Sequence, residues 1–343
     1  MITKSWRLHV PKIWLFIVIL GLLIASLIWV NRTVSADLDP TRGSANLASS
    51  TMKDCSHTST GILPLTDMAR TVYDGSAVGG LYPDGNDVPS NHLQMGMVAS
   101  QSIEPLNQQG HPASSGKIVF MSLGMSNTSQ EFDRFREIAN GHTNEALVLE
   151  NGAQAGYDAA RIADPNSDYW TRIDAHLASR DLSRLQVQAI WLKEAVASDT
   201  DQFPQDAQQL QGYLRMIVLI AKNRYPNTKV IYISSRTYGG YGEPHSISPE
   251  PWAFEGGFAV KWLIESQVLG EDPALSYNNA PWLGWGPYLW ADGMTPRSDG
   301  LIWRCNDFED DGIHPSPSGE TKVANILFDF LNSDPTTQWF PGP

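Results

Sequence analysis

The chain has 343 residues, of which 42% are hydrophobic, 10% aromatic and 18% charged. This composition can supply a folded core and excludes a disordered or collagen-like chain. The formal net charge of −13 makes binding to a nucleic-acid backbone unfavourable. The length fits either two domains or one α/β domain with attached segments.

The N-terminal segment is basic and apolar. An uncharged run from Ile13 to Val30 would extend about 27 Å as a helix, which is just enough to cross a bilayer core. Three basic residues precede this run and one follows closely, so the positive-inside rule places the N-terminus in the cytoplasm. We therefore expect residues 1–36 to be a cytoplasmic stub and transmembrane anchor that leaves the rest of the chain outside the cytoplasm. The small residues that end at Ala36 also fit a cleaved signal peptide, which would release a secreted protein.

Two segments separate this anchor from the main domain, which we place at residues 117–343. Residues 37–60 are rich in small polar residues without periodicity, which is typical of a linker. Residues 61–116 are punctuated by Gly, Pro, Asp and Asn, and they predict an extension of loops and short strands packed on the core. The only cysteines, Cys55 and Cys305, could form one disulfide in an exported protein or remain two buried thiols.

Short apolar runs alternate with longer helical patterns from residue 117 onward, which predicts βαβ units around a mainly parallel sheet. The apolar runs predict strands at 118–121, 146–149, 187–192 and 229–233. The helical patterns cover about 129–140, 154–163, 169–180, 206–224, 254–268 and 318–332. Ligands of such sheets bind beyond the carboxyl ends of the strands, so the residues that follow each strand are candidates for a site.

Ser126 follows the first predicted strand in the sequence Ser-Leu-Gly-Met-Ser-Asn-Thr, a glycine-containing turn into a helix. A hydroxyl at this position can serve as a nucleophile, with the backbone N–H of the same serine facing a developing oxyanion. Serine and asparagine are also ordinary residues at helix N-termini, so a purely structural role stays open.

Asp311 and His314 lie in the sequence Asp-Asp-Gly-Ile-His-Pro, just before the last predicted helix. The carboxylate can accept a hydrogen bond from one imidazole nitrogen while the other nitrogen faces a nucleophile. Two alternatives remain: a turn without chemistry, or a cation site. The acids that could bind such a cation are Asp307, Glu309, Asp310 and Asp311.

These two segments together resemble the SGNH, or GDSL-like, hydrolase superfamily, and more closely its Gly-x-Ser-Asn branch, which includes sialate O-acetylesterase and acetylxylan-esterase-like proteins. The resemblance covers about residues 117–332 and implies a flavodoxin-like three-layer α/β sandwich with a mainly parallel five-stranded sheet. It implies that Ser126 is the nucleophile, His314 the general base and Asp311 its orienting carboxylate. Asn151-Gly152 resembles the second family block, so the N–H groups of Ser126 and Gly152 would belong to the oxyanion hole.

Lys193 departs from the family pattern. The third block normally places an Asn or Gln after the third strand, whereas this chain reads Trp191-Leu192-Lys193-Glu194. An ammonium group on a flexible stem differs from a neutral amide donor. Lys193 could be the third oxyanion donor, a member of a structural ion pair, or a partner of Glu194 or of a substrate carboxylate.

We expect Arg236, Tyr238 and Trp285 to contact the substrate. Arg236 and Tyr238 follow the fourth predicted strand, and Trp285 lies in a cluster with Trp282, Tyr288 and Trp290. Exposed aromatic faces can stack on sugar rings, and an arginine can bind an anionic sugar. Packing in the core is the alternative for the aromatic residues, and a surface salt bridge is the alternative for the arginine.

These expectations describe an exported serine esterase that hydrolyses O-acyl esters, chiefly O-acetyl esters on carbohydrate, and needs no metal or organic cofactor. The expected partners are an acylated carbohydrate or another small ester, and the membrane through the N-terminal segment. Two other functions stay open on the same fold: a non-catalytic, membrane-anchored carbohydrate-binding protein and an O-acyltransferase.

Overall fold

The computed structural model describes residues 52–197, 201–244 and 246–342. The predicted anchor and residues 37–51 of the predicted linker lie outside these ranges. No helix within the described ranges has both the length and the apolar character needed to cross a membrane.

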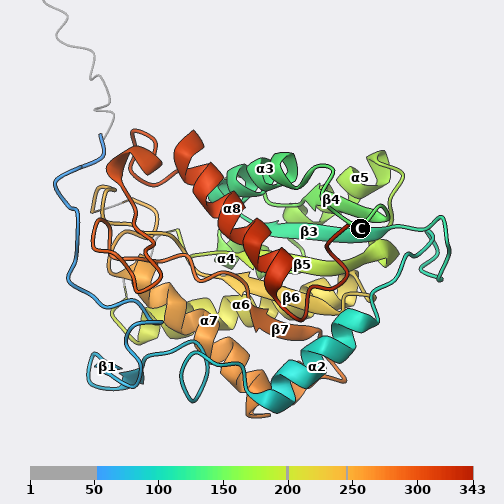
Figure 1. Ribbon diagram of the computed structural model, residues 1–343, viewed down its shortest axis with the longest axis horizontal. Coiled ribbons are helices and arrows are strands. Elements are labelled where there is room, and N and C mark those ends of the chain that lie inside the picture. The colour runs from blue at the N-terminus through green and yellow to red at the C-terminus, as the bar shows by residue number, and fades with distance from the viewer. Residues whose placement is uncertain (1–51, 198–200, 245, 343) are drawn as a thin grey trace, which may run out of the picture. The chain divides into compact units, whose positions relative to one another are not determined.

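A five-stranded parallel sheet forms the centre of the structure (Figure 1). Its strands are β3 (Ile118–Gly124), β4 (Leu147–Asn151), β5 (Val187–Lys193), β6 (Val230–Ser234) and β7 (Trp282–Trp285). The spatial order is β4-β3-β5-β6-β7, and every neighbouring pair is parallel. This is the flavodoxin-like strand order, so the predicted parallel α/β sheet is confirmed.

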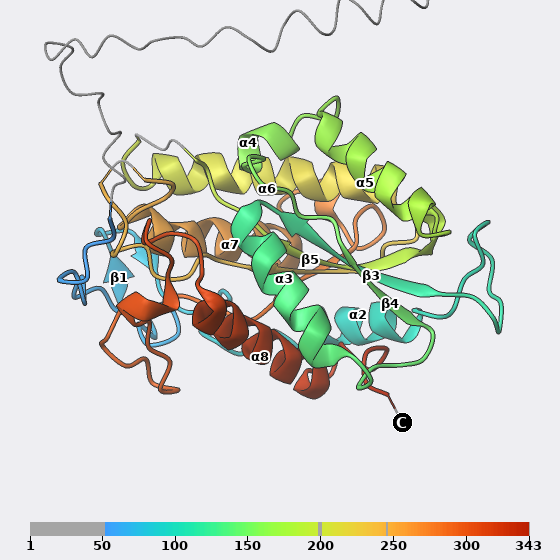
Figure 2. The same cartoon turned by 90° about the horizontal axis from the view of Figure 1, so that it is seen from above.

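Helices cover both faces of this sheet. They are α2 (Ser90–Gln101), α3 (Ser126–Ala139), α4 (Ala159–Ile162), α5 (Asp168–Ser179), α6 (Gln205–Arg224), α7 (Trp252–Val268) and α8 (Pro317–Ser333), with short 3₁₀ turns at Arg184–Gln186, Pro273–Leu275 and Cys305–Asp307. Figures 1 and 2 show α2, α3 and α8 on one face and the other four helices on the opposite face. The three layers agree with the predicted sandwich, and the long helices lie within a few residues of their predicted ranges.

Two elements differ from the sequence prediction. The fifth strand, β7, lies in the aromatic segment for which no strand was predicted, and α2 lies in the segment predicted as loops and short strands. The residues that α2 buries are His92, Gly96 and Ser100, so this helix shows no apolar stripe in its sequence. A Cβ at Gly96 would lie 2.6 Å from the Trp282 ring, which explains why the buried face carries a glycine. Elsewhere in the same segment, β1 (Val72–Tyr73) and β2 (Ala77–Val78) form a small antiparallel pair.

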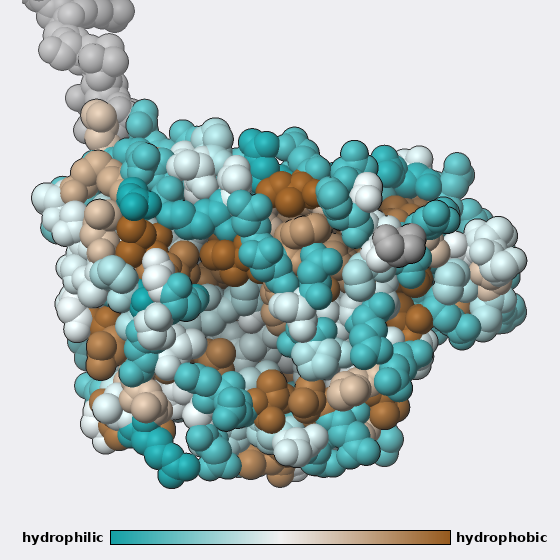
Figure 3. Space-filling view, in the orientation of Figure 1, coloured by the Kyte–Doolittle hydropathy of each residue, from teal (hydrophilic) through white to brown (hydrophobic). Residues whose placement is uncertain are grey.

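The core lies between the central strands and the helices on either side. Every residue of β3, β5 and β6 is buried, as expected for a parallel sheet that is covered on both faces. On the face seen in Figure 3, apolar residues occur in separate small patches among hydrophilic ones.

Candidate functional site

Ser126, His314 and Asp311 meet at the carboxyl end of the sheet. Ser126 is the first residue of α3, and the other two lie on the loop that leads into α8. The Ser126 Oγ lies 2.8 Å from His314 Nε2, although 188 positions separate the two residues. His314 Nδ1 lies 2.5 Å from Asp311 Oδ2. The structure therefore brings all three predicted catalytic residues together in one hydrogen-bonded chain.

The turn from β3 into α3 gives Ser126 its position. Gly124 ends the strand with φ +157°, and a Cβ on it would lie 2.4 Å from the backbone oxygen of Lys193 and 2.5 Å from Thr128 Oγ1. Only glycine avoids both collisions, so the chain can turn sharply at this point. Ser126 then starts the helix, where its N–H has no partner within the helix.

The loop that carries His314 is fixed by a second glycine and by an asparagine. Gly312 has φ +70°, and a Cβ on it would lie 2.3 Å from the backbone oxygen of Tyr241. Asn127 Nδ2 donates a 2.8 Å hydrogen bond to the backbone oxygen of Ile313. Asn127 thus joins the start of α3 to the histidine loop, a role for which the Ser-Asn pair in the sequence was the signal.

The Asp311 carboxylate is held in its ionised form. Burial tends to raise its pKa, but hydrogen bonds from the His314 ring and from the backbone N–H groups of Ile313 and His314 hold the pKa below its usual value. An ionised carboxylate at this point fixes the orientation of the imidazole.

Gly152 follows β4, the strand next to β3, and is buried beside the Ser126 turn. A Cβ on it would lie 2.6 Å from the backbone oxygen of Ser122. The preceding Asn151 accepts a 2.8 Å hydrogen bond from Ser122 Oγ and donates to the backbone oxygen of Ser129. These bonds fix the end of β4 against the β3–α3 turn, so the two backbone segments predicted for the oxyanion hole lie on adjacent strands.

Lys193 does not have the predicted oxyanion role. Its Nζ donates to both carboxylate oxygens of Glu131, at 2.6 Å each, and both side chains are 1% exposed. Burial lowers the pKa of Lys193 and raises that of Glu131, while the opposite charge of each partner acts in the other direction. Of the interpretations left open, the structural ion pair is the one found, and its partner is Glu131. Glu131 is one of the buried residues of α3. An acidic residue on the apolar side of a predicted helix is a sequence signal for a buried cationic partner.

Tyr238 and Trp285 are not available for the predicted substrate contacts. Tyr238 is 1% exposed, and its hydroxyl donates to the backbone oxygen of His57. Trp285 is 5% exposed, and its Nε1 donates to the backbone oxygen of Leu81. Both predictions are wrong, because the segment 53–82 covers these rings. Arg236 is also buried, at 3% exposure, and lies near Met125 instead of on the surface.

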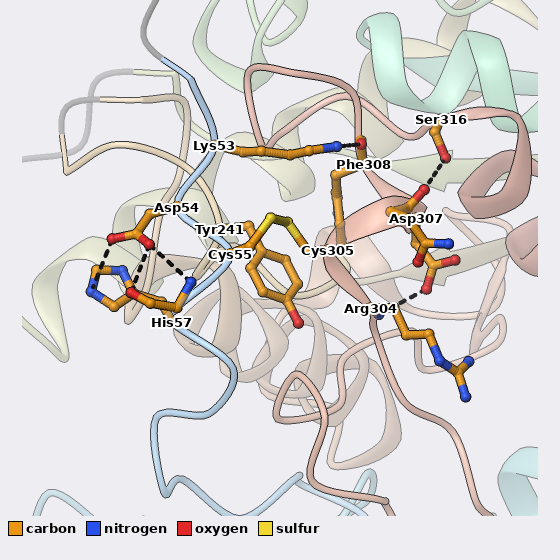
Figure 4. Close-up of a disulfide and its surroundings, with 12 residues drawn as sticks. Lys53, Asp54, Cys55, His57, Tyr241, Arg304, Cys305, Asp307, Phe308 and Ser316 are labelled. Carbon is orange, nitrogen blue, oxygen red and sulfur yellow. Dashed lines mark hydrogen bonds and ion pairs between the residues drawn. A yellow bond between two sulfur atoms is a disulfide. The ribbon is translucent and has the colours of Figure 1, made fainter.

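The chain from residue 53 onward is fastened to the loop that carries Asp311. Cys55 and Cys305 form a disulfide, and Figure 4 shows it beside Lys53 and Phe308. The Lys53 N–H donates to the backbone oxygen of Asp310, and the Lys53 ammonium donates to that of Phe308. Residues that were assigned to the end of a linker therefore hold the loop of Asp311 in place. Within the described ranges, no three His, Cys, Asp or Glu side chains are grouped so that they could hold a metal ion.

Comparisons with known proteins give structural similarity at low sequence identity. No family model and no curated protein matches the chain. A GDSL-like lipase from Bacteroides thetaiotaomicron is similar over 70% of this chain and 95% of its own, with 13% identity and a TM-score of 0.35. A carbohydrate esterase family 3 protein from Talaromyces cellulolyticus covers 63% of this chain and 96% of its own, with 13% identity and a TM-score of 0.35. A carbohydrate acetylesterase from Sinorhizobium meliloti covers 63% and 99%, with 15% identity and a TM-score of 0.34.

Proposed function

We propose that the chain is a serine esterase of the SGNH, or GDSL-like, type that hydrolyses O-acyl esters. The observation that carries the proposal is the chain of hydrogen bonds from Ser126 Oγ through the His314 ring to Asp311 Oδ2, at 2.8 Å and 2.5 Å. The 2.8 Å contact lies within the range required for proton transfer from a nucleophile to a base, and the contact with Asp311 orients the imidazole that takes the proton. The Gly-x-Ser-Asn and Asp-x-x-His sequences support the same assignment.

The proposed reaction has two acyl-transfer steps. Ser126 Oγ attacks the ester carbonyl carbon while His314 Nε2 takes the hydroxyl proton, and the carbonyl electron pair moves onto oxygen. The N–H groups of Ser126 and Gly152 stabilise that oxyanion. Its collapse expels the alcohol, which takes the proton from His314, and leaves an acyl-serine. Water then attacks the acyl-serine by the same route and releases the acid.

The finer substrate assignment extends the same proposal. We propose O-acetyl groups on carbohydrate, on the strength of the resemblance to the Gly-x-Ser-Asn branch. We also propose that the N-terminal segment anchors the chain in a membrane with the esterase domain outside the cytoplasm, or that cleavage after Ala36 releases it. Its basic flank and its 13–30 apolar run support export.

The first experiment is covalent labelling of the full-length chain in mild detergent with a fluorophosphonate. We expect one adduct by intact mass, absent from Ser126→Ala and from His314→Ala. Ser179→Ala, which removes an exposed serine of α5, is the matched control and should label like the wild type. A folded wild-type chain without an adduct would refute the esterase and favour the non-catalytic carbohydrate-binding protein. Product analysis with a sugar acceptor then separates hydrolysis from transfer.

A further inference from the structure

Arg236 is a buried cation with almost no hydrogen bonds. Its side chain is 3% exposed, and its Nε has no hydrogen-bond partner among the described residues. Its one hydrogen-bond contact within the described part of the chain joins Nη1 to Met125 Sδ at 3.9 Å, and a thioether is a weak acceptor. Arg297, in contrast, is 8% exposed and donates to the backbone oxygens of Tyr288 and Trp290 and to the Asp299 carboxylate. Burial of an unpaired charge is costly, so the position of Arg236 calls for an explanation.

The segments that carry Ser126 and Arg236 leave the sheet from strand ends that the register aligns. Gly124 on β3 is paired with Lys193 on β5, which is paired with Ser234 on β6. Ser126 lies two residues after Gly124, the end of β3, and Arg236 lies two residues after Ser234, the end of β6. The Arg236 guanidinium extends back toward β3, because it reaches Met125, the residue immediately before Ser126.

The acids around Arg236 are each bonded to another group. Burial lowers the pKa of Arg236, and the nearby Glu131, Glu194, Glu250 and Asp311 only partly oppose that shift. Glu131 is paired with Lys193, and Asp311 is bonded to His314.

The other two acids carry reduced charge. Burial raises the pKa of Glu194 well above its usual value, and its Oε2 accepts from the N–H of Ala195. Burial raises the pKa of Glu250 to about 7, and this carboxyl accepts from Gly239, Phe254 and Trp290. Arg236 therefore keeps donor groups that no acid in the described chain takes up.

We infer that Arg236 supplies the third oxyanion donor of this site, in place of Lys193. The inference rests on the proposed esterase function. As Ser126 Oγ bonds to the ester carbon, the carbonyl π electrons move onto oxygen, and the guanidinium donates a hydrogen bond to that oxygen beside the N–H groups of Ser126 and Gly152. The electrons return to re-form the carbonyl when the alcohol leaves, so Arg236 itself neither gains nor loses a proton. A fixed cation beside the developing negative charge stabilises it.

The test measures kcat, KM and the thermal midpoint of the full-length chain with 4-nitrophenyl acetate, a neutral ester. We expect Arg236→Gln to lower kcat by about 10²-fold or more, with little change in KM. The thermal midpoint should stay the same or rise, because removing an unpaired buried charge relieves a desolvation cost. Arg236→Lys retains the charge without the reach of the guanidinium fork and should recover part of the lost kcat.

Arg215→Gln is the matched control, because Arg215 on α6 is half-buried and paired with Asp272. It should leave kcat unchanged. A kcat for Arg236→Gln within twofold of the wild type overturns the inference, as does a loss of kcat that only follows a lower thermal midpoint. If Arg236→Gln does not fold, the kcat of Arg236→Lys is measured in its place. A kcat of Arg236→Lys equal to that of the wild type also overturns the inference.

A second substrate separates catalysis from anchoring. If Arg236→Gln raises KM for 4-nitrophenyl succinate, which carries a carboxylate, but leaves acetate hydrolysis unchanged, then Arg236 binds a substrate anion and the inference is wrong. A wild-type chain that neither hydrolyses the acetate nor takes the fluorophosphonate label refutes the proposed function together with the inference. An active wild type beside an equally active Arg236→Gln refutes only the inference.

Discussion

The contact between Asp311 and His314 should control how well the imidazole accepts the Ser126 proton. Asp311→Asn keeps the shape of the side chain but removes the carboxylate that fixes the imidazole tautomer, so we expect kcat to fall by up to about 10⁴-fold. Stopped-flow or steady-state hydrolysis of 4-nitrophenyl acetate measures the effect. Asp310→Asn, on the exposed neighbouring acid, is the control and should change kcat little. Equal rates in the two variants would contradict the assigned roles.

Lys193 and Glu131 form the second residue pair that can be tested. Lys193→Met leaves the Glu131 carboxylate buried without its partner, which should cost about 3–5 kcal/mol in the free energy of unfolding. The double variant Lys193→Met/Glu131→Leu removes both charges and should recover most of that loss. Urea unfolding measures both values.

The activity of the same double variant tests the role of Lys193 directly. Because Lys193 is bound to Glu131, the double variant should hydrolyse 4-nitrophenyl acetate within a few-fold of the wild-type kcat. A loss of several hundredfold with a normal thermal midpoint would restore Lys193 as an oxyanion donor.

The same residues show which site features could be predicted from the sequence. Ser126, Asp311 and His314 occur in short local patterns whose chemistry depends on neighbouring residues, so they were found before the fold was known. The burial of Trp285 and Tyr238 depends on a distant segment that packs over them, and no local pattern records that contact. Arg236 was found as a candidate, but its contact with Met125, beside Ser126, depends on the tertiary fold.

Whether a helix or strand could be predicted from the sequence depends on which side chains it buries. Strands β3, β5 and β6 are buried apolar runs, and helix α6 has a regular apolar face, so the sequence predicts both kinds of element. Strand β7 has only four residues and reads as an aromatic cluster. Helix α2 buries small and polar side chains against it, including Gly96 under Trp282. These two elements specify each other across more than 180 positions, which periodicity cannot detect.

The disulfide joins the N-terminal part of the described chain to the segment that leads to Asp311. The Cys55–Cys305 bond closes a loop with a sequence separation of 250, for which chain entropy predicts a contribution of about 5 kcal/mol. We expect Cys305→Ser to lower the thermal midpoint, and Cys55→Ser to lower it by the same amount. The double variant should match either single variant, because only one bond is lost. A double variant with a wild-type midpoint would show that Lys53 and its neighbours hold the segment without the bond.

For the whole molecule, buried carboxyl groups should set the pH dependence of stability. Glu255 on α7 contacts Asp206 on α6, and both side chains are nearly inaccessible. Burial, together with the neighbouring Asp206, raises the pKa of Glu255 to about 8, although a hydrogen bond from Tyr73 opposes the shift. The pKa of Glu250, also buried, is raised to about 7. The folded chain therefore holds protons that the unfolded chain releases above its ordinary carboxyl pKa.

The sign of the effect follows from proton linkage. A group whose pKa is raised by folding contributes stability at low pH and loses that contribution as the pH rises through the folded pKa. The free energy of unfolding should thus fall between pH 5 and about 8, by about 1.4 kcal/mol per pH unit for each extra proton held. Glu255→Gln removes one such proton and should reduce the slope by that amount in urea unfolding at a series of pH values. Glu271→Gln, on an exposed acid, should keep the wild-type slope. A Glu255→Gln slope equal to that of the wild type would mean that the contact between α6 and α7 does not hold a proton.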